Sequence, residues 1–189
     1  MKLSAVLLAG GKSRRMGRDK SAILFRDSPL WQRQLDILRN LEPKELFVSA
    51  QTDPPWRPVD VEFVADAQPS RGPLSGIAAA LSRTAADHLL ALAIDMPLMT
   101  DDYLRELFKQ PQPGCGVVPM IDNRAEPLTA IYPRDALVDF IDALAGNNFS
   151  LQPLVTKLIA AGKLQPIQVS PKEQALFRNL NEPADLDAH

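Results

Sequence analysis

Two long apolar segments constrain the fold of this chain more than any other feature of its sequence. They span residues 3–9 and 88–94, and both are apolar almost throughout rather than at alternate positions. A strand of this kind is covered on both faces, as in a parallel sheet that carries helices on each side. The two segments therefore predict buried strands of an α/β sheet, with residues 88–94 at its centre.

Predicted strands and helices alternate along the rest of the chain. Further strands are predicted at residues 45–50, 61–64, 116–120, 128–132 and 164–169. Helices are predicted after Ser28 (as N-cap) and Pro29, after Thr100, and at residues 74–84, 133–144, 150–161 and 182–188. This alternation is typical of an open, mostly parallel α/β sheet with right-handed crossovers, and residues 110–150 are irregular enough to include an antiparallel pair. We expect residues 1–189 to form a single domain.

Composition excludes several classes of function. The formal net charge is −2, so the chain as a whole does not attract nucleic acid or an anionic membrane. A single cysteine, Cys115, rules out an internal disulfide framework and a cysteine-based zinc site. No apolar stretch reaches the ~20 residues needed to span a bilayer, and the first residues lack the pattern of a signal peptide. We therefore expect a cytoplasmic protein.

A loop rich in glycine and cations follows directly after the first predicted strand. It reads Gly10-Gly-Lys-Ser-Arg-Arg-Met-Gly-Arg-Asp-Lys20. Glycines let the backbone approach an anion closely, and lysine and arginine supply the opposing charge. The glycine spacing fits neither a Walker A loop nor a dinucleotide-binding Gly-x-Gly-x-x-Gly motif. A solvated basic turn is the alternative, but the position after a buried strand favours phosphate binding, with Lys20 and Arg15 as the best candidates for phosphate contact.

Two aspartates end other predicted strands. Asp66 follows the strand at residues 61–64, and Asp95 ends the apolar segment at residues 88–94. Loops at the carboxyl ends of strands in an open α/β sheet meet at one crevice, so both side chains are expected near the glycine-rich loop. A carboxylate there is a natural ligand of Mg²⁺, which proteins usually bind through one or two carboxylates and substrate phosphates. The alternatives are a helix or turn cap for Asp95 and a simple turn for Asp66.

Nucleophilic catalysis is not supported. The two histidines, His88 and His189, lie near no plausible nucleophile in the sequence, so a Ser-His-Asp triad is not indicated. Cys115 stands between two glycines without a neighbouring histidine and is interpreted as a small structural residue.

The loop and several later motifs resemble one enzyme family. Leu8-Ala-Gly-Gly-Lys-Ser-Arg-Arg-Met-Gly-Arg-Asp-Lys20 resembles the signature loop of nucleotidyltransferases that take an NTP and release pyrophosphate. Later motifs occur in the order found in MobA-type molybdenum cofactor guanylyltransferases: Gly72-Pro-Leu-Ser-Gly76, Asp95-Met-Pro97, Glu126-Pro-Leu128 with Tyr132, and Phe177-Arg-Asn-Leu-Asn-Glu-Pro183. The resemblance runs nearly from end to end.

The resemblance implies a Rossmann-like three-layer α/β/α fold and transfer of GMP from GTP to the phosphate of molybdopterin. It implies nucleotide contacts from the loop and from two strand ends: Leu8, Ala9, Gly10, Gly11, Lys20, Asp66 and Asp95. Asp66 would contact the nucleoside, Lys20 the phosphates, and Asp95 the Mg²⁺ ion. Asn179 and Asn181 match a late Asn-x-Asn segment, which is expected on the acceptor or metal side.

Two positions depart from the family pattern. Residue 49 is often asparagine in the family but is Ser49 here. The loop before the helix at residue 150 tends to bring an arginine towards the acceptor, but here it reads Gly-Asn-Asn-Phe-Ser150 and holds no cation.

The expected chemistry agrees with these residues. A phosphate acceptor is already anionic near neutral pH, so its attack on an NTP needs positioning and charge neutralisation rather than a strong base. The expected partners are GTP, molybdopterin and other cofactor-biosynthesis proteins or an apo-molybdoenzyme. Two alternatives stay open: a related enzyme with another base or acceptor, such as a cytidylyltransferase or a sugar-phosphate nucleotidyltransferase, and a non-catalytic nucleotide-binding protein that delivers cofactor.

Overall fold

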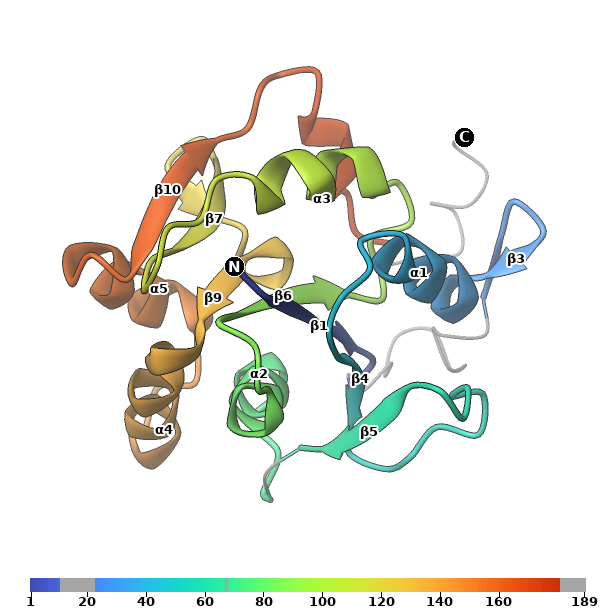
Figure 1. Cartoon of the computed structure of the whole chain (residues 1–189), viewed down its shortest axis with the longest axis horizontal. Helices are drawn as coiled ribbons and strands as arrows, with labels where there is room; N and C mark the ends of the chain where they lie inside the picture. The colour runs from blue at the N-terminus through green and yellow to red at the C-terminus, as the bar shows by residue number, and fades with distance from the viewer. Residues whose placement is uncertain (11–22, 67, 181–189) are drawn as a thin grey trace.

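A computed structural model describes residues 1–10, 23–66 and 68–180 of the chain (Figure 1). Its main feature is an eight-stranded sheet in which seven strands run in the order β10-β7-β9-β6-β1-β4-β5 and β8 pairs with β7. The strands of this sheet are β1 Leu3–Leu8, β4 Leu46–Ala50, β5 Glu62–Ala65, β6 His88–Ala93, β7 Gly116–Ile121, β8 Arg124–Ala125, β9 Ile131–Pro133 and β10 Leu164–Gln168. A separate small hairpin pairs β2 (Leu24–Phe25) with β3 (Ser28–Pro29).

The sheet is mostly parallel, as the sequence predicts. β1 pairs in parallel with both β4 and β6, β4 with β5, and β7 with β10. The exceptions are β9, which runs antiparallel between β6 and β7, and the short β8, which pairs antiparallel with β7. An antiparallel strand therefore lies within residues 110–150, as expected, and β6 occupies the centre of the strand order.

Side chains of the central strands alternate between two apolar layers. In β1, Leu3, Ala5 and Leu7 pack into one buried cluster, whereas Val6 and Leu8 pack into the other. Because every residue of β1 and β6 is buried, both strands must be covered on two faces. This arrangement explains why their sequences are continuously apolar.

Helices cover both faces and give three layers (Figure 1). The helices are α1 Leu30–Arg39, α2 Pro73–Arg83, α3 Asp101–Phe108, α4 Leu137–Ala145 and α5 Leu151–Ala160. α1 and α3 pack on the face of Leu3 and Leu7, and α2, α4 and α5 pack on the face of Val6 and Leu8. The α2 helix has Gly72, at φ 67°, as its N-cap and Pro73 as its first residue. Glycine tolerates this left-handed conformation and proline suits a first helical turn, so the sequence fixes where α2 starts.

Two local predictions are wrong. Ser28 does not cap α1: Ser28–Pro29 forms strand β3, and Pro29 precedes the helix without a side-chain cap hydrogen bond. Ser28–Pro29 pairs with β2 instead of capping the helix. The predicted strand at residues 128–132 is also shorter, because Pro127–Thr129 forms a 3₁₀ turn and the strand begins at Ile131.

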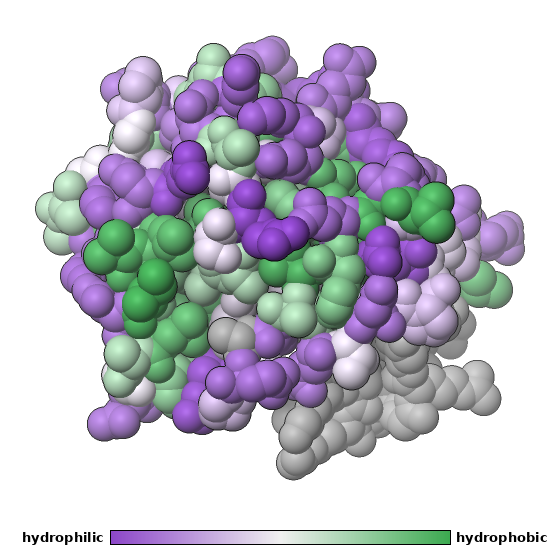
Figure 2. All heavy atoms as spheres, turned by 60° about the horizontal axis from the view of Figure 1, so that its bottom comes forward, coloured by the Kyte–Doolittle hydropathy of each residue, from purple (hydrophilic) through white to green (hydrophobic). Residues whose placement is uncertain are grey.

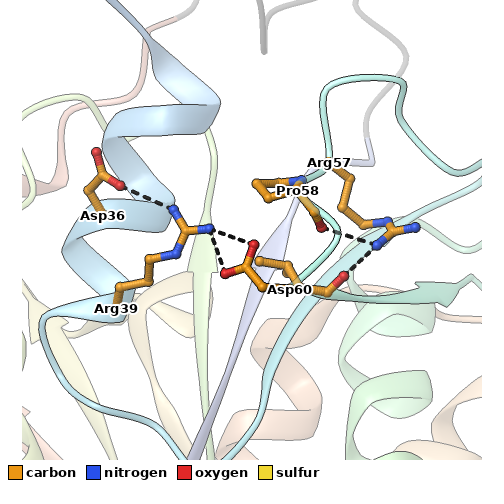
Figure 3. A network of polar contacts seen from close by, with 6 residues as sticks. Asp36, Arg39, Arg57, Pro58 and Asp60 are labelled. Carbon is orange, nitrogen blue, oxygen red and sulfur yellow. Dashed lines mark hydrogen bonds and ion pairs between the residues drawn. The ribbon is translucent and has the colours of Figure 1, made fainter.

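Arginines fix the long connection between β4 and β5 (Figure 3). From α1, Arg39 donates to both carboxylate oxygens of Asp60, at 3.2 and 3.0 Å. Within the connection, Arg57 pairs with Asp53 and donates to the backbone carbonyl of Val61. Exposed ion pairs contribute at most about 1 kcal/mol each. These ion pairs mainly fix the position of the segment that leads from the end of β4 to the start of β5.

The outer surface over α2, α4 and α5 is mixed in polarity. Figure 2 shows hydrophobic side chains gathered at the left of this face, on the side where α4 lies in Figure 1. Within α4, Val138 and Ile141 are exposed hydrophobic residues, with exposed fractions of 63% and 53%. Within the described residues, no helix is long and apolar enough to cross a membrane.

Gly116 gives a first test of the β7–β9 contact. A Cβ atom at Gly116 would lie 1.9 Å from the carbonyl oxygen of Ile131. This oxygen belongs to a paired backbone, so it cannot move aside cheaply, and we expect Gly116→Ala to lower the free energy of unfolding by about 3 kcal/mol. Gly146→Ala is the matched control, because its Cβ would meet the nearest atom at 3.4 Å. Urea denaturation measures both, and similar stabilities for the two variants would contradict this packing.

His88 gives a second test, based on pH. The ring is fully buried at the start of β6, its Nε2 lies 3.3 Å from the carbonyl oxygen of Cys115, and burial lowers its pKa below the ordinary value of 6.5. Between the folded and unfolded pKa values the unfolded chain binds more protons, so stability falls as pH drops through 6.5, by at most about 1.4 kcal/mol per pH unit. Comparing unfolding free energies at pH 7.5 and 5.5 should show a smaller pH-dependent loss for His88→Gln than for the wild type. An equal loss in both proteins would contradict this assignment.

Candidate active site at the carboxyl edge of the sheet

Four neighbouring strands end in one row at the candidate site. β6, β1, β4 and β5 are adjacent and parallel, so their carboxyl ends lie on the same edge. Register places Leu8 opposite both Ala93 of β6 and Ser49 of β4, and Ser49 opposite Val64 of β5. The residues after these strand ends include Gly10, Asp66 and Asp95. The convergence expected for these three positions is therefore confirmed at the level of the backbone.

Asp66 is a buried carboxylate rather than a simple turn residue. Only 6% of the residue is exposed, and its backbone N–H donates to Ala50 at 3.0 Å. The hydroxyl of Ser49 donates to Oδ1 at 2.8 Å, and the hydroxyl of Ser70 donates to Oδ2 at 2.9 Å. Burying a carboxylate is costly unless hydrogen bonds compensate for lost water. The two serines supply that compensation and fix the orientation of the carboxylate.

Two glycines leave the space that this carboxylate and its serine occupy. A Cβ atom at Gly10 would lie 3.2 Å from Oδ2 of Asp66. A Cβ atom at Gly76 in α2 would lie 2.7 Å from the hydroxyl oxygen of Ser49 and 3.0 Å from a methyl carbon of Leu8. A side chain at Gly76 would therefore collide with Ser49, whereas one at Gly10 would make a tight contact with Asp66. Gly10, from the loop after β1, and Gly76, from the Gly72-Pro-Leu-Ser-Gly76 motif, therefore both lie beside the Asp66 carboxylate.

Asp95 lies at the other end of the row. It follows β6, and the N–H of the preceding Ile94 donates to the carbonyl of Leu8 at 3.2 Å. Its own carbonyl accepts from the N–H of Leu180 at 2.8 Å. The chain near residue 180 therefore returns to the strand end that carries Asp95, and exposed Asn179 lies next to this contact.

Asp66 and Asp95 are too far apart to bind one metal ion together. Their strands, β5 and β6, are separated by β4 and β1, so the backbones stand about 14 Å apart at the usual strand spacing. Mg²⁺ requires each ligand oxygen at about 2.1 Å, which two aspartate side chains cannot provide across that gap. Among the described residues, no three His, Cys, Asp or Glu side chains come together to hold a metal. The arrangement fits an ion bound by Asp95 and by substrate phosphates.

The segment around Glu126 packs against the turn after Asp95. The hydroxyl of Thr129 donates to the sulfur of Met96 at 3.0 Å, and the hydroxyl of buried Tyr132 donates to the carbonyl of Pro127 at 2.7 Å. Burial raises the pKa of the Glu126 carboxyl. These contacts explain why the Glu126-Pro-Leu128 motif occurs together with Tyr132: the tyrosine holds the turn that places Glu126 near the strand ends.

Four of the predicted site residues, Gly11, Arg15, Lys20 and Asn181, lie outside the described residues. Sequence reasoning also missed two contributors. Ser49 stood out only as a departure from a family pattern, and Ser70 was not singled out. A polar residue at the end of an otherwise apolar strand, beside an aspartate that ends the next strand, is the signal that points to Ser49.

Comparison with known proteins identifies the class to which this fold and edge belong. Residues 5–161 match the model of the MobA-like NTP transferase domain. The match covers most of the chain, and the chain belongs to this family of nucleotidyltransferases.

Two relatives and one solved structure show which members of this family the chain is similar to. The chain is 34% identical to the probable molybdenum cofactor guanylyltransferase of Opitutus terrae, over 98% of this chain and 93% of the relative. It is 33% identical to the protein of the same name from Methanothermobacter thermautotrophicus, over 97% and 96%. The structure is similar, with a TM-score of 0.75 at 24% identity, to molybdopterin-guanine dinucleotide biosynthesis protein A from Archaeoglobus fulgidus, over 98% and 95% of the two chains. The structural likeness confirms the three-layer nucleotidyltransferase fold.

The contact between Gly76 and Ser49 can be tested by a double-mutant cycle. Gly76→Ala introduces a Cβ that collides with the Ser49 hydroxyl, whereas Ser49→Ala removes that oxygen and opens the space. Because Ser49→Ala also removes a hydrogen bond to Asp66, we expect both single variants to be less stable than the wild type. The double variant should lose less stability than the sum of the two single losses, by a coupling energy of about 1 kcal/mol. Urea denaturation of the wild type and the three variants measures the coupling. Additive changes would show that the two positions are not in contact.

Proposed function

We propose that this protein transfers GMP from GTP to the phosphate of molybdopterin, forming molybdopterin guanine dinucleotide and pyrophosphate. The acceptor and the product would be exchanged with other cofactor-biosynthesis proteins or with an apo-molybdoenzyme. GTP is a cytoplasmic metabolite, which supports the cytoplasm as the place of action.

One observation carries the proposal: Asp66 and Asp95 stand at opposite ends of a row of four strand ends, with Gly10 between them. A nucleotide laid along this row would have its nucleoside at Asp66 and its phosphates at β1 and Asp95. The absence of a side chain at Gly10 lets the backbone at the middle of the row lie against the Asp66 carboxylate. Lys20 and Arg15, which lie outside the described residues, are proposed to contact the phosphates.

The choice of guanine rests on the loop and on the relatives. Leu8-Ala-Gly-Gly11 is the form of the loop associated with guanine in the family that it resembles. The curated relatives with high coverage are named as guanylyltransferases. The end of the row near Asp66 is the proposed nucleoside end, because a fixed carboxylate accepts hydrogen bonds from nucleoside N–H or O–H groups.

The reaction needs few catalytic groups from the protein. An oxygen of the acceptor phosphate attacks the α-phosphorus of GTP, the bond to the β-phosphate oxygen breaks, and pyrophosphate leaves with that electron pair. The second pKa of a phosphate monoester is about 6, so at neutral pH the attacking oxygen carries no proton to remove. The protein must align the two phosphates and offset their repulsion. Cations in the loop and a carboxylate at each end of the row meet these needs without a catalytic histidine or cysteine.

A divalent metal fits the position of Asp95. When bound, Mg²⁺ would neutralise charge on the α-phosphate and on the leaving pyrophosphate. In this proposal Asp95 holds the ion and the Glu126 segment supports the turn beside it. Asn179 and Asn181 are proposed to lie on the acceptor or metal side.

Dinucleotide formation tests the proposal directly. Purified protein is incubated with Mg²⁺, molybdopterin and each of GTP, CTP, ATP and UTP in turn, and both the dinucleotide and pyrophosphate are measured. We expect product with GTP and little with the other nucleotides. Pyrophosphate release only with CTP would point to a cytidylyltransferase, and GTP binding without any product would contradict an enzymatic role.

Asp95→Asn tests the metal assignment. Loss of a metal ligand removes several kcal/mol of charge stabilisation, so we expect kcat to fall at least about 100-fold while the melting temperature changes little. Asp102→Asn is the control, because Asp102 is an exposed acid in the first turn of α3. Near-normal turnover of purified Asp95→Asn would remove Asp95 from the metal site.

A further inference from the structure

A described arginine is fixed beside the candidate site without belonging to the glycine-rich loop. The guanidinium carbon of Arg71 lies 4.1 Å from the centre of the Phe149 ring. Arg71 comes from the connection between β5 and α2, and Phe149 from the loop between α4 and α5. These segments are far apart in sequence, so the contact joins two loops of the fold.

Both loops reach the carboxyl edge of the sheet. Arg71 follows Ser70, whose hydroxyl donates to Asp66, and precedes Gly72, the N-cap of α2. β9 runs opposite to the other long strands, so α4 after it ends at the carboxyl edge, and α5 returns to the start of β10. Gln152 in the first turn of α5 donates to the carbonyl of Ala125, next to Glu126, at 2.7 Å. The loop at residues 146–150 is therefore on the same edge as Asp66 and Asp95.

The position of Arg71 is fixed by its backbone and by its side chain. The backbone N–H of Arg71 donates to the hydroxyl of buried Ser75 at 2.9 Å, and the preceding residue is held by Asp66. The ring of Phe149, which is partly buried against the α2 side of the core, supports the guanidinium plane. Stacking on a ring occupies the face of a guanidinium and leaves the N–H donors on its edge available.

In the part of the chain that the structure describes, the N–H donors of the Arg71 guanidinium face no carboxylate in an ion pair. No described carboxylate forms an ion pair with Arg71, whereas Arg57 and Arg83 each pair with an acid. An exposed guanidinium that lies over a ring and pairs with no described carboxylate is suited to bidentate binding of a phosphate. The loop at residues 146–150 supplies the ring but no cation.

We propose that Arg71, supported by Phe149, binds the phosphate monoester of the acceptor. The inference rests on the proposed function, because a transferase that joins two phosphates must hold the second one apart from the donor. Its two loops are distinct from the loop after β1 that is proposed to hold the donor phosphates. Arg71 would bring the acceptor phosphate to the row from the α2 side and offset part of its charge.

Steady-state kinetics of Arg71→Ala test this assignment. Loss of a charge-assisted contact should raise KM for molybdopterin about 10- to 100-fold, while KM for GTP changes less than about twofold. Arg71→Lys should recover part of the affinity, because it restores the charge without the planar fork. Phe149→Leu, which keeps the arginine but removes the ring, should give a smaller increase in KM for the acceptor.

Arg83→Ala is the matched control, since Arg83 is an exposed arginine at the opposite end of α2. An unchanged KM for molybdopterin in Arg71→Ala, or an equal rise in KM for GTP, would overturn the proposal. Melting temperatures of all variants identify any that are unfolded, and Arg71→Lys then decides the outcome.

A titration with inorganic phosphate separates this inference from the proposed function. NMR of arginine Nε–H groups should show a shift at Arg71 and none at Arg83 as phosphate is added. If the wild type forms no guanine dinucleotide, the proposed function fails, and the phosphate titration still decides whether Arg71 binds a phosphate. A titration that leaves the Arg71 signal unchanged overturns the site.

Discussion

The parallel pairing of β1 with β4 and β6 is the constraint on which the rest of the structure depends. β1 is buried along its whole length, so it can exist only with strands on both sides and helices on both faces. Parallel pairing then brings the ends of β6, β1, β4 and β5 to one edge. The segments that follow these strands, including Gly10, Asp66 and Asp95, are brought to that edge by strand pairing, and local contacts then orient them.

A second constraint acts locally at Asp66. A carboxylate that is 6% exposed needs hydrogen bonds, and the hydroxyls of Ser49 and Ser70 provide them. A side chain at Gly76 would collide with the Ser49 hydroxyl, and one at Gly10 would make a tight contact with the carboxylate. Four residues from different elements are thus explained by one buried group. The departure from asparagine at residue 49 has a structural reason: a short hydroxyl fits between Asp66 and α2.

Sequence reasoning predicted the class of fold and the edge that carries the site, because both follow from patterns carried by single segments. Apolar strands and the residues that end them can be read locally. Contacts between distant segments could not be predicted in this way. The stacking of Arg71 on Phe149 depends on β9 running antiparallel, which turns α4 and α5 so that their connection reaches the carboxyl edge. The error at Ser28 has a similar cause, because pairing with β2 outweighs the local capping preference.

The central claim is that a nucleotide lies along the row of strand ends, with its nucleoside at Asp66 and its phosphates towards Asp95. A crystal structure with Mg²⁺ and a non-hydrolysable GTP analogue tests it most directly. We expect a hydrogen bond from the nucleoside to the Asp66 carboxylate and a metal ion bound by Asp95 and the phosphates. A nucleotide in the opposite orientation, with its phosphates at Asp66, or a metal ion held away from Asp95, would contradict the account.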